Sequence, residues 1–210
     1  MSKRTEGPRK APKIRSAARI SIAPTYPTMP SNQHMNQLII TQATLQDVEH
    51  LQRIGRQTFF ETFAASNSAE NMHAYLEEGF SLDKLTAELR NPHSAFYLAK
   101  LDNIVVGYVK VNTDLAQTEP QEANALEIER IYVLEEYHGK KVGQLLYEQA
   151  MQLATQAQAD YVWLGVWEEN PRAIRFYQKN GFTEFGKHVF VLGDDEQTDI
   201  LMKRPLKGRC

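Results

Sequence analysis

The sequence of 210 residues contains a single cysteine, Cys210, at its last position. One thiol excludes an internal disulfide and cannot form a cysteine cluster for a metal ion. The apolar runs are also far shorter than the roughly 20 residues that a membrane-spanning helix needs, and no segment near the N-terminus resembles a signal peptide. We therefore expect a cytoplasmic protein without a membrane partner.

Several common motifs of ligand binding and catalysis are missing as well. The sequence has no Gly-x-Gly-x-x-Gly for a dinucleotide and no Walker-type loop for a nucleoside triphosphate. No spacing of His, Asp and Glu predicts a metal site, and Ser66 and Ser68 lack a partner pattern for nucleophilic catalysis. We predict an activity that needs no metal ion.

Charge is divided unevenly along the chain. Residues 1–36 carry seven Lys and Arg, one acidic residue and five of the nine prolines, whereas residues 37–210 carry 17 Lys and Arg against 25 Asp and Glu. We predict that residues 1–36 form a disordered basic extension and residues 37–210 a single domain. The extension has three interpretations: a non-native leader with Met35 as an alternative start, a tether to nucleic acid or another acidic surface, or a transit peptide. The acidic body argues against nucleic acid as a partner of the domain itself.

The first part of the domain shows one strand and then three helix starts. The strand spans residues 38–41, and the capping box Thr44-x-x-Asp47 begins a helix directly after it. Asn67-x-x-Glu70 predicts the start of a second helix. Ser81 predicts the cap of a third helix, which must stop before Pro92.

The middle of the domain reads as a hairpin and a loop. Strands at 95–100 and 104–111 are joined by Asp102-Asn103, a composition typical of a tight turn. Gly107 indicates a bulge or a close approach of another backbone. Residues 114–124 are polar and predict a loop.

The last part alternates between strands and helices. One helix runs from Val142 onward, and another has Pro171 in its first turn and ends at Gly181. An acidic turn, GDDEQTD, separates the last two strands. The four strands of this part are predicted at 126–133, 161–167, 182–191 and 198–203. The order β-α-α-α-β-β-β-α-β-α-β-β predicts a mixed α/β fold with helices on both faces of a central sheet.

Gly139, Lys140 and Lys141 lie where the helix from Val142 begins, although that end of a helix carries positive partial charge and attracts acidic residues. A strand, a glycine-bearing turn and a helix direct several backbone N–H groups at one point, which suits a phosphate. The two lysines therefore either neutralise a bound pyrophosphate or extend into solvent.

Two longer segments carry a family resemblance. LEIERIYVLEEYHGKKVGQLLYEQAM resembles the acetyl-CoA-binding segment of the GCN5-related N-acetyltransferases (GNAT), in which a strand runs into an R/Q-x-x-G-x-G/A turn. His138, Lys141 and Gly143 occupy the three marked positions, and only Gly143 matches the consensus. ENPRAIRFYQKNGF resembles the N-x-x-A-x-x-F-Y-x-x-x-G-F block of the same family. The chain is also similar to the PaiA-like spermidine/spermine N-acetyltransferases over roughly residues 38–204, in ETF, SAENMHAYLEEGF, GYVKVN and LGDDEQTDILM.

The resemblance implies both a fold and a cosubstrate. The sheet should be central, twisted, mixed but mostly antiparallel, with its central strands splayed apart. Acetyl-CoA should lie at that split, its pantetheine along the strand and its pyrophosphate in the turn. The residues that the family pattern assigns to acetyl-CoA are Ile131, Tyr132, Val133, His138, Gly139, Lys140, Lys141, Val142, Gly143, Asn170, Ala173 and Phe176.

The resemblance also implies catalytic residues. Tyr177 falls on the tyrosine that protonates the departing CoA sulfur in the family, and its alternative is a core aromatic. Strand alternation places Glu127, Glu129, Ile131 and Val133 on one face. A carboxylate there can remove a proton from an amine of pKa ~10, directly or through water. The resemblance makes Glu129 the first choice and Glu127 the second. The alternative for either glutamate is a salt bridge with the neighbours of Arg130 or a solvated loop edge. One amide of residues 131–133 would stabilise the oxyanion.

The acceptor is expected to be a cation because the domain is acidic. Trp163 and Trp167 either wall the acceptor groove or belong to the core, and His73 and His93 are expected at the surface. The acidic residues that either contact the acceptor or remain solvated are Glu61, Glu77, Glu78, Asp194, Asp195, Glu196 and Asp199.

We therefore predict transfer of an acetyl group from acetyl-CoA to a primary amine of spermidine, spermine or a similar small polyamine, by direct attack in a ternary complex. Two alternatives stay open. The acceptor can be another amine, such as a peptide N-terminus or an amino acid, or the domain can be a non-catalytic acyl-CoA-binding module, because fold does not fix chemistry. A homodimer is common in the resembling family and is included among the expected partners.

Overall fold

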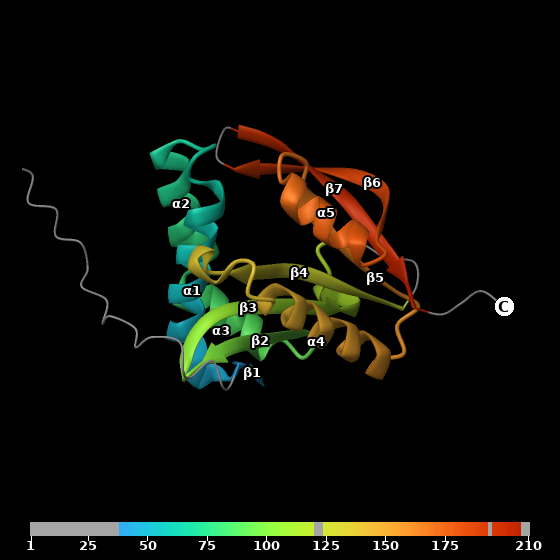
Figure 1. Ribbon diagram of the computed structural model, residues 1–210. Coiled ribbons are helices and arrows are strands. Elements are labelled where there is room, and N and C mark those ends of the chain that lie inside the picture. Colours follow the sequence, from blue (N-terminus) through green and yellow to red (C-terminus); the bar gives the residue numbers. More distant parts are fainter. Residues whose placement is uncertain (1–37, 120–123, 193–194, 207–210) are drawn as a thin grey trace, which may run out of the picture. The chain divides into compact units, whose positions relative to one another are not determined.

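Seven segments of the described chain pair into one sheet in the order β1-β2-β3-β4-β5-β7-β6, shown in Figure 1. The computed structural model describes residues 38–119, 124–192 and 195–206, so the predicted extension at 1–36 lies outside the described residues. The strands are β1 Leu38–Gln42, β2 Ser94–Leu101, β3 Ile104–Thr113, β4 Ala125–Val133, β5 Tyr161–Trp167, β6 Thr183–Leu192 and β7 Asp195–Pro205. Their pairing is antiparallel throughout except between β4 and β5.

The helices follow the predicted order between these strands. They are α1 Val48–Phe63, α2 Ala69–Gly79, α3 Leu82–Arg90, α4 Val142–Gln156 and α5 Pro171–Lys179. Short 3-10 turns cover Leu45–Asp47, Asp114–Ala116 and Glu135–Tyr137, and the second of them lies within the predicted loop at 114–124. The mixed α/β class and the mostly antiparallel sheet are confirmed.

Local capping explains where the first helices begin. Thr44 forms the predicted capping box with Asp47, and the Ser81 hydroxyl accepts a hydrogen bond from the Lys84 amide at the start of α3. The predicted cap of α2 is wrong by one residue. Ser68 caps this helix by accepting from the Asn71 amide, whereas the Asn67 side chain donates back to the Phe63 carbonyl at the end of α1.

Two turns show how far composition predicts backbone geometry. Asp102 and Asn103 have φ angles of 48° and 67°, the left-handed values that a two-residue hairpin turn between β2 and β3 requires. The predicted acidic turn at 193–199 is too long, because β7 already begins at Asp195 and pairs there with Leu192. The acidic and polar side chains after Asp195 predicted a turn, but the backbone of this segment pairs with β6 and continues as a strand.

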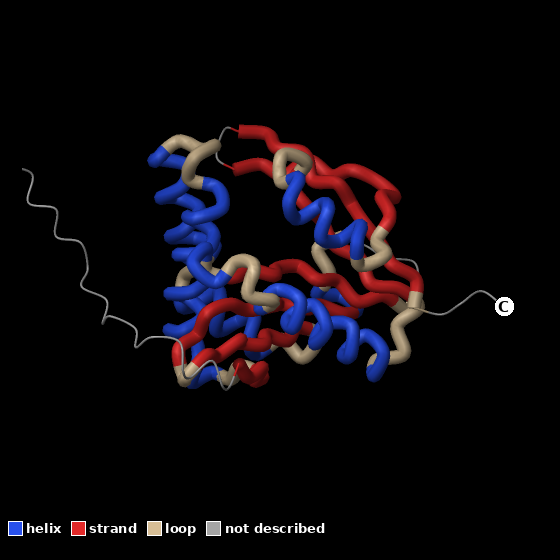
Figure 2. The backbone as a smooth tube through the Cα atoms, in the orientation of Figure 1, coloured by secondary structure: helices blue, strands red, loops and turns tan. Residues whose placement is uncertain are grey.

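Helices cover both faces of the sheet, as Figure 2 shows. On one face α4 buries Leu146, Ala150 and Ala154 against β3 and β4. On the other face α1 packs on β3 and β4 through Leu51 and Ile54, and α3 packs on β2. These apolar helix stripes and the inward side chains of the strands form the main core.

The sheet splits at its centre. β4 and β5 pair in parallel only through Ala125↔Tyr161, Leu126↔Val162 and Glu127↔Trp163, and beyond these pairs the two strands diverge in Figure 1. The predicted splaying of the central strands is therefore present. From Glu129 to Val133, the edge of β4 that faces away from β3 has no strand partner in the described chain.

A bulge in β4 corrects the predicted face of this strand. Lys110 pairs with Arg130 but the next residue, Val111, pairs with Ile128, so Glu129 is an extra residue. Glu127 and Glu129 share a face, since both accept from Asn112. Ile131 and Val133 do not share it, because they pair with Val109 and Gly107, which alternate with Lys110 along β3. The Val133 side chain packs beside Gly107 and Gly143 of α4. A one-residue insertion reverses which side chains face α4.

Candidate active site

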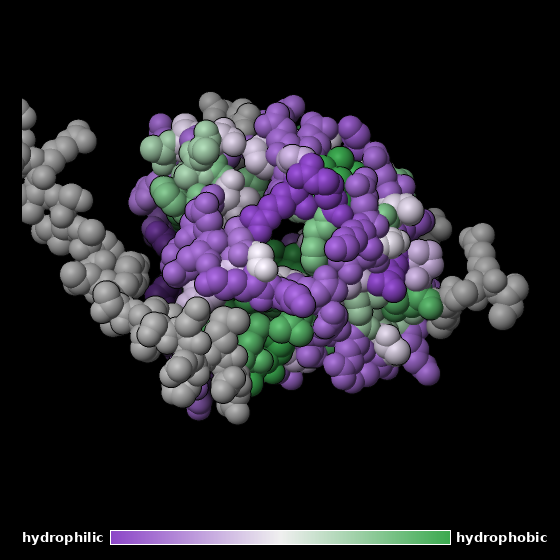
Figure 3. Space-filling view, in the orientation of Figure 1, coloured by the Kyte–Doolittle hydropathy of each residue, from purple (hydrophilic) through white to green (hydrophobic). Residues whose placement is uncertain are grey.

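Two hollows meet where β4 and β5 diverge. The first, called here the inner cavity, has a volume of about 270 Å³ and lies between Phe59 of α1, Tyr75 of α2, Glu127 of β4, Trp163 of β5 and Asp199 of β7. The second, the outer groove, has a volume of about 720 Å³ and runs along β4 to the start of α4 and to α5. Figure 3 shows an opening on this face with a hydrophilic rim and hydrophobic residues deeper inside.

The outer groove collects nearly all the residues that the family pattern assigns to acetyl-CoA. Lys140 is the exception, because its ammonium lies 4.7 Å from the ring centroid of Tyr137 and it does not line the groove. The predicted residues that line the groove are Ile131, Tyr132, Val133, His138, Gly139, Lys141, Val142, Gly143, Asn170, Ala173 and Phe176.

The free edge of β4 turns backbone groups into this groove. The Val133 carbonyl accepts from His138 Nε2 at 2.8 Å, while the next amide, that of Leu134, donates to Val106 on the β3 side. Because backbone groups alternate along a strand, the N–H groups of Ile131 and Val133 point into the groove. His138 Nδ1 lies 2.7 Å from Arg172 Nη1, which fits a ring with its hydrogen on Nε2.

The turn before α4 has the geometry of an anion site. Lys141 is the N-cap residue, has a φ of 65° and offers no side-chain cap, so the first-turn amides of α4 have no capping acceptor. Gly139 has a φ of 78°, and the space where a β-carbon would lie is open. Lys141, Arg172 and Lys179 add positive charge along the groove. These features fit the diphosphate of a coenzyme A.

Tyr177 lies at the junction and lines both hollows. Its ring packs against Phe176 and Phe182, and burial, followed by the neighbouring Tyr147, raises the pKa of its phenol. The phenol therefore stays protonated at neutral pH. Nearby, Asn170 Oδ1 caps α5 by accepting from the Ala173 amide at 3.0 Å, which leaves its amide nitrogen for another partner.

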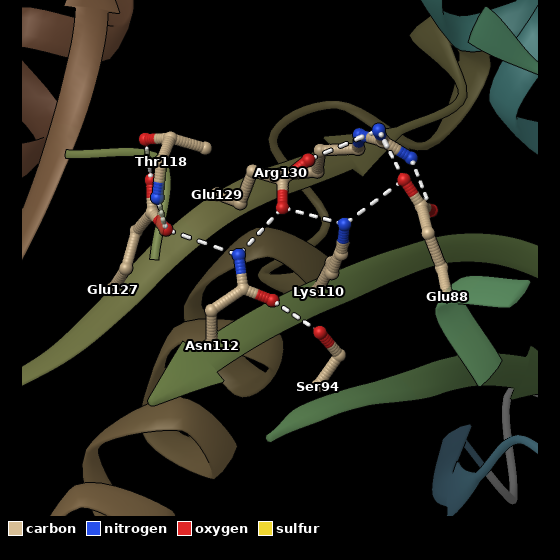
Figure 4. A network of polar contacts seen from close by, with 8 residues as sticks. All are labelled: Glu88, Ser94, Lys110, Asn112, Thr118, Glu127, Glu129 and Arg130. Carbon is tan, nitrogen blue, oxygen red and sulfur yellow. Dashed lines mark hydrogen bonds and ion pairs between the residues drawn. The ribbon is translucent and has the colours of Figure 1, made fainter. Parts of the chain in front are cut away.

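Glu129, the first choice for a base, is held in a network of charges, drawn in Figure 4. Its carboxylate lies 2.6 Å from Lys110 Nζ and 3.0 Å from Arg130 Nη2, and both cations also contact Glu88 of α3. Burial favours the protonated form, but Arg130, Lys110 and the hydrogen bonds outweigh it and lower the pKa of Glu129. A carboxylate held in this way is a weak base.

Glu127 was the second choice for the base. Among the described residues, every side chain or amide that hydrogen-bonds to its carboxyl is uncharged. It accepts from the Thr118 amide and hydroxyl and from Asn112 Nδ2. Burial raises the pKa of Glu127, and hydrogen bonds from Thr118 and Asn112 offset this in part. Two carboxyls whose surroundings separate their pKa values are the usual sign of an acid–base site.

The inner cavity is lined by only some of the residues predicted to contact the acceptor. Asp199 lines it, and so do Trp163 and Trp167. Glu61 lies instead in the outer groove and accepts from the Glu135 amide, Glu77 pairs with Arg56, and Glu78 and Glu196 are exposed. Asp194 and the side chain of Asp195 lie outside the described residues. His73 is exposed, and His93 pairs at the surface with Asp114.

Several polar residues of this site were not among the predicted ones. Lys110 and Asn112 are buried on β3, while Thr118 and Glu119 reach the cavity from the loop before β4. Glu119 forms a 2.6 Å contact with His188 of β6. Lys110 and Asn112 alternate in the otherwise apolar GYVKVN, and this pattern was the available signal. The loop residues carry no such pattern.

This fold, with a groove along β4 and a cavity joined to it at Tyr177, is that of a GNAT-type N-acetyltransferase. Residues 56–182 match the Acetyltransferase (GNAT) family, and the chain belongs to this family. It is an acetyl-CoA-dependent acyltransferase.

The relatives with similar sequences and structures are N-acetyltransferases. An uncharacterized N-acetyltransferase from Lactobacillus delbrueckii subsp. lactis is 43% identical over 80% of this chain and 96% of its own. A spermidine N(1)-acetyltransferase from Thermoplasma acidophilum is 25% identical over 79% and 95%. Among solved structures, a PaiA N-acetyltransferase from Thermoplasma acidophilum in complex with coenzyme A matches with a TM-score of 0.67 and 25% identity, over 81% of this chain and 99% of that one.

Neither a membrane-spanning helix nor a metal-binding cluster occurs among the described residues. None of their helices has the length and apolar character to cross a membrane. They also contain no group of three or more His, Cys, Asp or Glu side chains placed to bind a metal ion.

Proposed function

We propose that the acceptor is a primary amine of a small polyamine such as spermidine or spermine, and that this amine attacks acetyl-CoA directly while both are bound. The observation that supports this is the charge of the inner cavity. Its walls carry the four carboxylates Glu119, Glu127, Glu129 and Asp199 but only Arg130 and His188 as basic groups. The similarity to a spermidine acetyltransferase points the same way.

Asp199 is the strongest candidate for holding an ammonium group of the acceptor. It lies half-buried on β7 in the wall of the cavity, and no hydrogen bond or ion pair to its carboxylate is found among the described residues. Burial raises the pKa of Asp199, and His188 offsets this in part. A half-buried carboxylate without an ion pair is stabilised when an ammonium group binds beside it.

The donor would lie in the outer groove. We propose that the Ile131 and Val133 amides bond the pantetheine, that Asn170 adds a side-chain contact, and that the turn from His138 to Gly143 with the first-turn amides of α4 holds the diphosphate. One of the β4 amides at the split also stabilises the negative charge that develops on the thioester oxygen.

The proton transfers use residues at the junction. Glu127, directly or through a water molecule, removes the proton from the acceptor ammonium, and the neutral amine attacks the thioester carbon. As the new C–N bond forms and the C–S bond breaks, Tyr177 gives its proton to the sulfur. The nitrogen loses its second proton at the same stage, and this proton restores Tyr177 directly or through water, while Glu127 releases its own proton to solvent. The assignment of Glu127 over Glu129 rests on the neutral partners of Glu127 and the cationic partners of Glu129.

An assay of thiol release from acetyl-CoA with a panel of amines tests the acceptor. We expect kcat/KM for spermidine and spermine to exceed that for a monoamine, an amino acid or a peptide N-terminus. Asp199→Asn should lower the ratio of kcat/KM for polyamines to kcat/KM for monoamines about tenfold, because one charge contact at a partly buried site contributes roughly 1–2 kcal/mol. The exposed Glu196→Gln is the matched control and should keep the preference. Equal turnover of monoamines and polyamines would contradict the proposal.

The oligomeric state and the cellular location complete the proposal. We propose a homodimer and a cytoplasmic location on the family resemblance. Sedimentation at several concentrations tests the first of these.

A further inference from the structure

A row of three polar side chains crosses the sheet beside the inner cavity. Ser94 of β2 pairs with Asn112 of β3, which pairs with Glu127 of β4, so all three lie on one face. Asn112 is fully buried, with 0% exposure, and Glu127 is 2% exposed. A buried primary amide requires hydrogen-bond partners, and the partners that it has fix its orientation.

Each polar atom of the Asn112 side chain is bonded, as Figure 4 shows. Its Oδ1 accepts from the Ser94 hydroxyl at 2.9 Å. Its Nδ2 donates to Glu127 Oε2 at 3.0 Å and to Glu129 Oε2 at 2.6 Å. A carboxylate can only accept, so Ser94 and the two glutamates together determine which end of the amide faces β4.

The charges around this amide are distributed unequally. Lys110 of β3 and Arg130 of β4 contact Glu129 and Glu88, and none of the described cations contacts Glu127. The other charged groups that face the inner cavity are Glu119, His188 of β6 and Asp199 of β7. Asn112 is thus the side chain that connects Glu127 to the fixed charge of Glu129.

We propose that Asn112, oriented by Ser94, is a positioning residue that holds the Glu127 carboxylate beside the acceptor amine and sets the pH below which acetyl transfer stops. This inference rests on the proposed role of Glu127 as the base. Loss of the Asn112 donor removes a hydrogen bond that favours the ionised carboxylate, so Glu127 takes up its proton at a higher pH.

The pH dependence of kcat with both substrates saturating tests this role, because it reports groups in the ternary complex. We expect the midpoint of the acid limb to rise by about one pH unit in Asn112→Ala. It should rise further in Asn112→Asp, where a third carboxylate adjoins the other two, and less in Ser94→Ala, which leaves the amide free to turn. Thr58→Val removes a buried hydroxyl of α1 outside the site and is the control for lost packing; its midpoint should equal that of the wild type.

The outcomes separate the two proposals. If Glu127→Gln keeps the acid limb, Glu127 is not the base and that part of the proposed function fails. If Glu127→Gln abolishes the limb but the Asn112 and Ser94 variants leave its midpoint unchanged, only the role of Asn112 is wrong. Reduced stability without a shifted midpoint would show that Asn112 is merely structural.

Nuclear magnetic resonance of the wild-type chain supplies a second readout that does not depend on stable Asn112 variants. The side-chain amide signal of Asn112, assigned by backbone correlation, should titrate with the midpoint of the acid limb measured for kcat. That titration should be absent in Glu127→Gln. An Asn112 amide signal that does not move across the acid limb would overturn the proposal.

Discussion

Glu127 and Glu129 are two residues apart on β4, yet their surroundings move the pKa values of their carboxyls in opposite directions. Both are desolvated, so burial alone does not distinguish them. The difference comes from partners, since cations contact Glu129 and neutral donors contact Glu127. The sequence showed both glutamates but not which side chains contact them, and these come from β3, from Arg130 of β4 and from the loop before β4.

Unfolding experiments distinguish these two residues. Glu129 has a folded pKa below its unfolded value, so its contribution to stability is present above the unfolded pKa and is lost as the pH falls through the folded pKa. We expect Glu129→Gln to lower the free energy of unfolding by about 3 kcal/mol at neutral pH, because Lys110 and Arg130 lose a partner. This deficit should shrink in acid, where the wild type protonates Glu129.

The matched control is Glu127→Gln. The folded pKa of Glu127 is raised, so its contribution is present below the unfolded pKa and is lost as the pH rises through the folded pKa. Its replacement by a neutral amide should therefore cost little stability at neutral pH. Urea titrations of both variants at neutral and acidic pH measure the difference, and equal losses at neutral pH would contradict this account.

Tyr177 allows a test that preserves packing. Tyr177→Phe keeps the ring contacts with Phe176 and Phe182 and removes only the hydroxyl. We expect kcat to fall by about a hundredfold, the usual loss for one proton-transfer group, with the KM for acetyl-CoA nearly unchanged. Steady-state kinetics of the variant measure this, and full activity would exclude Tyr177 as the acid.

At the scale of elements, the start of α4 shows what a sequence pattern conveys and what it omits. The spacing from Val142 predicted the helix, and the strand, turn and helix predicted an anion site. The family consensus has glycine where this chain has Lys141, and the φ of 65° explains the consensus, since glycine adopts that conformation without strain. The different directions of Lys140 and Lys141 had no signal in the sequence.

This difference gives a prediction for acetyl-CoA binding. Lys141→Gln should raise the KM for acetyl-CoA several-fold at low ionic strength, and the rise should diminish with added salt because screening weakens the interaction with the diphosphate. Lys140→Gln should have a smaller effect, because its ammonium lies over Tyr137 and outside the groove. KM measured at two salt concentrations for both variants tests this. Equal effects would show that the lysines act only as general positive charge.

The β4 bulge is the main element-level feature that the sequence did not reveal. LEIERIYV has the composition of a regular strand, and one extra residue changes the partner of each residue beyond it without altering that composition. Regular alternation therefore placed Ile131 and Val133 on the wrong face. The bulge brings Glu129 to the same amide as Glu127.

At the scale of the whole domain, the order of strands and helices was predictable. Each element has its own hydrophobic spacing, and capping or turn residues, from Thr44 to Gly181, mark where elements begin and end. That most of the residues predicted for acetyl-CoA line one groove was predictable, because they lie in two continuous segments that match a family motif. The inner cavity was not, because its walls come from α1, α2, β4, β5 and β7, which are distant in sequence. Of the acceptor residues predicted from the sequence that the structure describes, only Asp199 and the two tryptophans lie in its wall.

The three residue pairs that join β4 to β5 have a mechanical consequence. Two half-sheets connected over so short a ladder can pivot about it, because few backbone hydrogen bonds resist the rotation. The ring contact between Phe63 and Trp167 and the Asn67–Gln197 hydrogen bond join the far sides of the wedge. A slight opening there would widen the inner cavity and leave the turn before α4 intact, so we expect amines of different girth to enter while the proposed donor groove keeps its shape.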